Sequence, residues 1–151
     1  MFSKKILVIE DTELMQRLIR DILEKEGYEV YSAYSGEEGL DMVAEVKPDL
    51  IILDIVMPGM SGFDVCRALR ANDSNILTPI IMLTSQVSED DKLIGLEMGA
   101  DDYITKPFDV AVLLARCNNL VNGRRILQEK FAHSTDISPY TLASNEMDRN
   151  F

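Results

Sequence analysis

The chain has 151 residues, 46% of them hydrophobic, so it can bury one proper core but is too short for two full domains. Its net charge of −11 lies within residues 1–123, and so acidic a surface argues against direct binding of a phosphate backbone. No apolar stretch approaches the roughly 18 residues of a membrane helix, so we expect a cytoplasmic protein without membrane contact through this region.

Apolar runs alternate with apolar residues at helical spacing in the first half of the chain. The run LIIL at 50–53 is typical of a parallel strand covered on both faces, and it leads directly into Asp54. Strands are predicted at 5–9, 28–34 and 50–54, with helices between them that end near Gly27 and before Pro48. The inward face of the first helix is expected to carry Leu14, Met15, Leu18, Ile19 and Ile22.

The second half of the chain continues this alternation. A third helix follows Gly62, and a fourth is expected from Ser88. Further strands are predicted at 79–84 and 102–105, before a last helix that starts near Asp109. Cys66 and Cys117 fall on the third and last helices without metal-ligand spacing, so we expect buried, reduced thiols.

Five strands that alternate with five helices predict an α/β fold, a doubly wound (βα)5 sandwich of the flavodoxin-like kind. Its parallel five-stranded sheet should have the order 2-1-3-4-5, with helices on both faces. Ligands bind at the carboxyl edge of such sheets, where these strands deliver polar side chains. The residues at the strand ends are Glu10, Asp11, Asp54, Thr84, Ser85, Lys106 and Pro107.

Glu10, Asp11 and Asp54 are expected to converge, because the first and third strands are neighbours in this order. Three carboxylates at close range repel one another unless a cation joins them or some take up protons. An all-oxygen ligand set with room for water suits Mg²⁺, or Mn²⁺, better than Zn²⁺. The sequence therefore predicts a magnesium site at this edge; the alternative for Asp54 alone is a cap of the following turn.

Four motifs in order resemble the receiver domains of two-component response regulators, the CheY-like family. They are VIED at 8–11, LDIVMPGMSG at 53–62, MLTS at 82–85 and GADDYITKPF at 99–108. Each is weak alone, but together at these spacings they are specific. We therefore expect a receiver domain at 4–122, followed at 123–151 by a linker and the start of a truncated downstream segment.

The resemblance implies a phosphorylation-activated switch in a His-Asp phosphorelay. Asp54 would accept the phosphoryl group from a histidine kinase or phosphotransfer domain. Asp11 would bind Mg²⁺ directly, supported by Glu10 and by the main-chain carbonyl of Val56. Such a receiver catalyses its own phosphoryl uptake and loss and is not an enzyme in its own right, although the full-length protein could include a histidine kinase.

Further roles are implied by the same resemblance. Thr84 and Lys106 would contact the phosphoryl oxygens, and the peptide bond from Lys106 to Pro107 would be cis. Tyr103 would change rotamer on phosphorylation. The side chains of Val56 and Gln86 would tune dephosphorylation by controlling how water reaches the phosphoryl group. Asp101 and Asp102 are interpreted as solvated loop acids.

Three rival functions share features with this sequence. A phosphohydrolase of the haloacid dehalogenase class needs a second acid two residues after the nucleophile, where this chain has Val56. A flavodoxin needs a Ser/Thr/Gly-rich phosphate loop after the first strand, where this chain has EDTEL at 10–14. A degenerate receiver that binds partners without phosphorylation is the stronger rival, although no site residue of the family is missing.

The segment after the receiver suggests an output. Residues 121–131 could extend the last helix, and residues 132–142 are polar like a linker. ISPYTLASNEMDRNF resembles, loosely, the connector to an AraC-type DNA-binding domain in hybrid sensor kinases; the alternative is a free-standing regulator. We expect phosphorylation-dependent homodimers through the face of the fourth helix, fifth strand and fifth helix. Transcription regulation would then act through DNA contacts of a downstream domain only.

Overall fold

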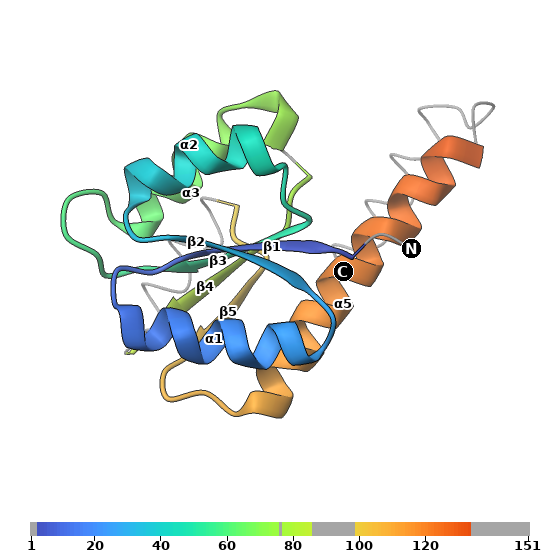
Figure 1. Ribbon diagram of the computed structural model, residues 1–151. Coiled ribbons are helices and arrows are strands. Elements are labelled where there is room, and N and C mark those ends of the chain that lie inside the picture. The colour runs from blue at the N-terminus through green and yellow to red at the C-terminus, as the bar shows by residue number, and fades with distance from the viewer. Residues whose placement is uncertain (1–2, 76, 86–98, 134–151) are drawn as a thin grey trace, which may run out of the picture.

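The computed structural model describes residues 3–75, 77–85 and 99–133, and it has one parallel sheet (Figure 1). The strand order is β2-β1-β3-β4-β5, which confirms the predicted doubly wound α/β fold. The fourth helix, expected from Ser88, lies outside the described residues. The strands are β1 (Lys5–Ile9), β2 (Glu29–Ala33), β3 (Leu50–Asp54), β4 (Ile80–Thr84) and β5 (Asp102–Thr105).

Helices cover both faces of the sheet (Figure 1). The described helices are α1 (Glu13–Lys25), α2 (Gly36–Val46), α3 (Gly62–Arg70), a short 3-10 helix η1 (Asp73–Asn75) and α5 (Val110–His133). α2 and α3 pack on one face and share a core with Leu7, Ile51 and Met82. α1 and α5 pack on the other face around Ile6, Ile52 and Leu83. Because both faces are buried, β3 and β4 are apolar along almost their whole length.

The inward face predicted for α1 was wrong in part. Leu14 is 81% exposed and Leu18 46%, whereas the fully buried positions are Gln16, Ile19 and Leu23. Ile19 and Leu23 are four residues apart, so they form one stripe that seats the helix on the sheet. Leu14 and Leu18 form a second stripe that this seating turns toward solvent.

Asp101 and Asp102 were expected to be solvated loop acids, but both form ion pairs with arginines. Arg70, at the end of α3, donates to Asp101 Oδ2 at 2.9 Å and to the carbonyl oxygen of Gly99 from Nε (2.9 Å) and Nη2 (2.7 Å). Its Nη1 also donates to the carbonyl oxygen of Thr78 at 2.7 Å. Arg70 thus ties α3 to the segments that enter β4 and β5. Asp102 pairs with Arg116 of α5 at 2.7 Å.

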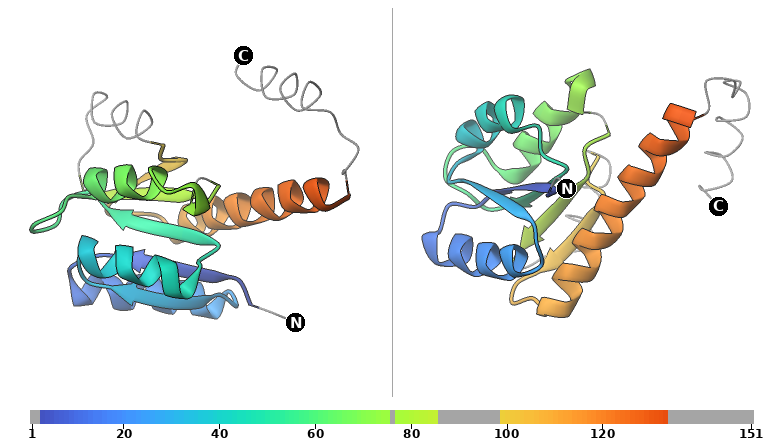
Figure 2. Two further views of the ribbon diagram at one scale, coloured as in Figure 1. Left: turned by 90° about the horizontal axis from the view of Figure 1, so that it is seen from above. Right: turned by 45° about the vertical axis from the view of Figure 1, so that its right-hand side comes forward.

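The last helix is the longest of the described helices. α5 runs from Val110 through Gly123 to His133, and its second half continues beyond the sheet (Figures 1 and 2). It therefore passes the expected domain boundary at 122 and 123, and that boundary stays a prediction. Of the expected linker and downstream segment, residues 134–151 lie outside the described part of the chain. No helix among the described residues is both long and apolar enough to span a bilayer.

Candidate functional site

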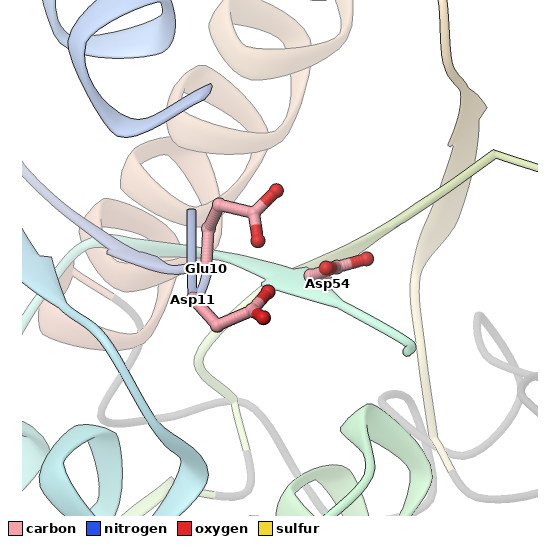
Figure 3. A group of neighbouring side chains, drawn as sticks. All are labelled: Glu10, Asp11 and Asp54. Carbon is pink, nitrogen blue, oxygen red and sulfur yellow. The ribbon is translucent and has the colours of Figure 1, made fainter. Parts of the chain in front are cut away.

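The carboxyl ends of β1 and β3 lie side by side, since Ile9 pairs with Leu53. Glu10 and Asp11 follow β1 directly, and Asp54 is the last residue of β3. One carboxylate oxygen from each of these three residues lies within 4.8 Å of the others, and Figure 3 shows the side chains gathered at this edge. Glu10 is 1% exposed and Asp54 4%. We call Glu10, Asp11 and Asp54 the carboxylate cluster.

Lys106 brings a positive charge to this cluster from the end of β5. Its Nζ donates to Glu10 Oε1 at 2.8 Å and lies 3.4 Å from Asp54 Oδ1. Burial would lower the pKa of Lys106, but its hydrogen bond to Glu10 and the charges of Asp54 and Glu10 raise the pKa overall. The ammonium is therefore held in its charged form. The peptide bond from Lys106 to Pro107 is cis.

Among the described residues, three carboxylates face the single cation Lys106, and this excess affects the pKa of Asp11. A side-chain hydrogen bond with Glu10, then partial burial and the charge of Glu10, raise the pKa of Asp11. Two carboxylates are thus close enough to compete for one proton. An excess of hard oxygen donors at this spacing fits a divalent cation such as Mg²⁺ better than a soft metal.

Thr84 and Tyr103 lie on the two strands beyond Asp54. Thr84 ends β4 and is 2% exposed, and its carbonyl oxygen accepts a hydrogen bond from the main-chain N–H of Lys106 at 2.6 Å. Tyr103, on β5, is half-buried and packs against the core on the α2 and α3 face. The sheet therefore places Thr84 beside Lys106, with Tyr103 one strand further from Asp54.

The loop after Asp54 folds back tightly because Gly62 has no side chain. A Cβ at Gly62 would collide with the main-chain carbonyl oxygen of Asp54 and come within 2.8 Å of the Cα of Ile55. The N–H of Gly62 instead donates to the carbonyl oxygen of Ile55 at 2.8 Å. Directly before it, Ser61 accepts from the N–H of Asp64 and starts α3. Gly62 is therefore needed to close the loop that carries Asp54.

Of the two residues expected to tune dephosphorylation, the structure describes only Val56. Val56 is 72% exposed on the loop two residues beyond Asp54, so its side chain is open to solvent near the cluster. Gln86 lies outside the described residues. The role of both residues stays a prediction.

Sequence reasoning missed Gln16, which reaches the same edge from α1. This residue is 1% exposed, and its Nε2 lies within 3.0 Å of three main-chain carbonyl oxygens at the ends of β1 and β2. A polar residue on a helix reads as solvent-facing by default. The signal that could have found it is its place three residues before Ile19 and seven before Leu23, in the stripe that seats the helix.

Several solved structures are similar to this chain in sequence and fold. The chain is 33% identical to the Vibrio cholerae chemotaxis protein CheY4, with a TM-score of 0.76 over 79% of this chain and 99% of that one. It is 32% identical to the receiver domain of a signal transduction histidine kinase from Syntrophus aciditrophicus, with a TM-score of 0.76 over 90% and 98%. It is 39% identical to the BeF3-activated N-terminal receiver domain of RstA from Klebsiella pneumoniae, with a TM-score of 0.73 over 78% and 98%.

The family comparison covers most of the chain. The profile of the response regulator receiver domain matches residues 6–118, which include the carboxylate cluster, Thr84, Tyr103 and Lys106. With the strand order and the acidic edge of the sheet, the match establishes that the chain belongs to the response regulator receiver domain family, the phosphorylation-activated switches of two-component signalling.

Proposed function

We propose that Asp54 is the phosphoacceptor of this receiver, and that the phosphoryl group comes from the phosphohistidine of a histidine kinase or phosphotransfer domain. The observation that carries the proposal is the buried contact of Asp54 with Lys106 inside the carboxylate cluster. In-line phosphoryl transfer asks the protein mainly for positioning and for neutralisation of the phosphoryl oxygens. A nucleophilic carboxylate beside a fixed ammonium supplies the attacking group and part of the neutralising charge.

The transfer forms one bond and breaks one. A carboxylate oxygen of Asp54 attacks phosphorus, an O–P bond forms, and the P–N bond to the donor histidine breaks with its electron pair left on the imidazole. Lys106 then moves its hydrogen bonds toward the phosphoryl oxygens, and the Thr84 hydroxyl donates a further one. Tyr103 then changes rotamer and, with Thr84, carries the change toward β5 and α5.

Mg²⁺, with Mn²⁺ as a substitute, would be held by Asp11, Glu10, Asp54 and the main-chain carbonyl of Val56. Bound there, it would supply the additional positive charge that the phosphoryl oxygens need. The excess of carboxylates over Lys106 supports this assignment. Val56 and Gln86 would then set how readily water reaches the acyl phosphate, since an apolar valine does not orient a nucleophilic water molecule.

The first prediction tests the phosphoacceptor. Incubation with acetyl phosphate and Mg²⁺ should add one phosphoryl group to the wild type, seen by intact-protein mass spectrometry, and none to Asp54→Asn. Asp73→Asn, which removes an exposed carboxylate from η1, should behave as the wild type does. Chelation of Mg²⁺ should abolish uptake. Undiminished uptake in Asp54→Asn would refute the proposal, and uptake by neither protein would favour a degenerate receiver.

A further inference from the structure

Gln16 is a buried amide that grips the main chain where the carboxylate cluster begins. Its Nε2 donates to the carbonyl oxygen of Val8 at 3.0 Å, of Glu10 at 3.0 Å and of Ala33 at 2.7 Å. Val8 is the penultimate residue of β1, Glu10 follows β1 directly, and Ala33 is the last residue of β2. One side chain of α1 therefore joins two neighbouring segments, β1 with the residue that follows it and the end of β2, at the edge of the sheet.

The orientation of this amide is settled by its surroundings. Three carbonyl oxygens around one atom require that atom to be the NH₂ group, because an oxygen there would repel all three. Its two hydrogens are shared among three acceptors, so at least one hydrogen bond is bifurcated. Gln16 Oε1 finds no hydrogen-bond donor among the described residues. The residue thus leaves one buried acceptor unsatisfied while serving three carbonyls, an arrangement whose cost sets it apart from ordinary core packing.

Glu10 is held at both its main chain and its side chain. Its N–H donates to the carbonyl oxygen of Ala33 at 3.0 Å, and its own carbonyl oxygen accepts from Gln16. Its carboxylate accepts from Lys106. Asp11 is the next residue and is less buried, so the direction of its side chain depends on how firmly the main chain of Glu10 is fixed. Groups that orient the ligands of a metal contribute roughly 10-fold to 100-fold to its affinity in known sites.

We propose that Gln16 is a positioning residue for the carboxylate cluster: it fixes the main chain of Glu10 so that the carboxylates of Glu10 and Asp11 are set for a divalent cation before it arrives. This inference rests on the proposed function, since it assumes that the cluster binds a cation. It assigns Gln16 no contact with the cation or with the phosphoryl group. Its effect is on cation affinity and acts through Glu10.

The second prediction tests this role with Mn²⁺ as the probe. Gln16→Met keeps the length and burial of the side chain but removes the donors, and we expect it to weaken Mn²⁺ binding about 10-fold, measured by the EPR signal of free Mn²⁺. Ile19→Ala is the matched control, because it removes buried volume from the same stripe of α1 and touches none of the three carbonyls. It should bind Mn²⁺ within about twofold of the wild type.

A second measurement separates positioning from general damage. The rate of phosphorylation by acetyl phosphate should recover to nearly the wild-type value in Gln16→Met at saturating Mg²⁺, with the defect confined to the Mg²⁺ concentration required. All comparisons use protein shown by circular dichroism to be folded. If Gln16→Met does not fold, Gln16→Asn replaces it, since its amide ends one carbon short of the carbonyls.

The outcomes distinguish this inference from the proposed function. If the wild type binds Mn²⁺ and Gln16→Met binds it equally well, the positioning role is wrong while the cation site stands. An equal loss in Ile19→Ala would also overturn the role, because packing alone would then explain the effect. If the wild type binds no Mn²⁺, both the cation site and the inference fall.

Discussion

At the scale of single residues, the site is a problem of charge. Asp54 ends an otherwise apolar strand and is only 4% exposed, and its burial as an anion would be costly without a partner. Lys106 provides one positive charge against three carboxylates, at 2.8 Å from Glu10 and 3.4 Å from Asp54. Among the described residues, this edge of the sheet is thus short of positive charge. A bound cation would reduce that shortage, and a phosphoryl group would increase it.

Cys117 permits a prediction about pH that does not depend on the site. It is fully buried on α5, and burial raises the pKa of its thiol from 9.0 to about 12. An acid whose pKa is higher in the folded state binds its proton more tightly there, so folding stability falls as pH rises above 9. Burial raises the pKa of the Tyr28 phenol to about 12, so it titrates in an overlapping range. Tyr28 is present in both proteins compared below.

The third prediction compares Cys117→Ala with the wild type. At pH 7 the wild type should be more stable by on the order of 1 kcal/mol, the usual size of a single small truncation in a core. Between pH 9 and pH 11 that advantage should shrink, because only the wild type must keep the Cys117 thiol protonated to stay folded. Urea unfolding at pH 7, 9 and 10.5 measures both proteins. A constant difference across this range would show that Cys117 ionises freely in the folded state.

At the scale of elements, α1 shows how one helix can carry two apolar stripes. At about 100° per residue, Leu14 and Leu18 lie more than a quarter turn from the direction shared by Gln16, Ile19 and Leu23. The helix seats the stripe of Gln16, Ile19 and Leu23 on the sheet and leaves Leu14 and Leu18 exposed. An exposed apolar stripe on α1, the helix that follows Asp11, suits a partner helix that must bring its histidine to Asp54, the proposed phosphoacceptor.

The fourth prediction concerns that stripe. Leu14→Glu should slow phosphoryl transfer from a phosphorylated histidine kinase domain about 10-fold, the effect of losing one apolar contact in an interface. It should leave uptake from acetyl phosphate unchanged, because Leu14 is 81% exposed and is not part of the core. Leu77→Glu is the matched control: Leu77 is 57% exposed but precedes β4, at the opposite end of the sheet. Equal slowing by both variants would mean that charge alone, and not the stripe, is responsible.

The comparison of sequence with structure follows the same distinction between patterns and contacts. All five strands were predicted to within one residue at each end. For β1, β3 and β4 the reason is that apolar runs bounded by polar turns determine buried parallel strands. The inward face predicted for α1 was wrong in part, because Leu14 and Leu18 match the helical period as well as Ile19 and Leu23 do. The contacts of Gln16 and Arg70 were missed because most of their partners are main-chain carbonyls, which are the same at every residue. Only the place of Gln16 in the buried stripe marks it in the sequence.

The carboxylate cluster was predictable for a related reason. Its residues end strands whose order follows from the alternation of the fold, so neighbouring strands bring them together without any detail of side-chain packing. Asp101 and Asp102 were misread because their cations, Arg70 and Arg116, are distant in sequence. Charge pairs across elements depend on the crossover geometry, and a pattern along the chain does not contain it.

At the scale of the whole molecule, the question is how a change at Asp54 could affect a surface away from the site. β5 lies at the edge of the sheet, and α5 covers the face beside it. Val110 and Val112 at the start of α5 are 48% and 40% exposed, and the Asp102–Arg116 pair joins β5 to α5 near them. The helix 4 part of the expected dimer face lies outside the described residues, so the β5 and α5 part carries the argument. Apolar side chains rimmed by a charge pair suit a two-fold interface.

The fifth prediction tests this surface on the chain as it stands. Phosphorylation adds roughly 1.5 to 2 negative charges at the opposite end of β4 and β5 from their entry loops, and we expect it to favour pairing through the β5 and α5 face. Beryllofluoride with Mg²⁺ should shift the mass measured by light scattering from monomer toward dimer, and Val112→Glu should reverse the shift. Leu77→Glu, an equal charge change away from this face, should not. Acetyl phosphate uptake by Val112→Glu should remain normal. If the wild type takes up the phosphoryl group normally but keeps a monomeric mass, phosphorylation acts by releasing a neighbouring domain instead.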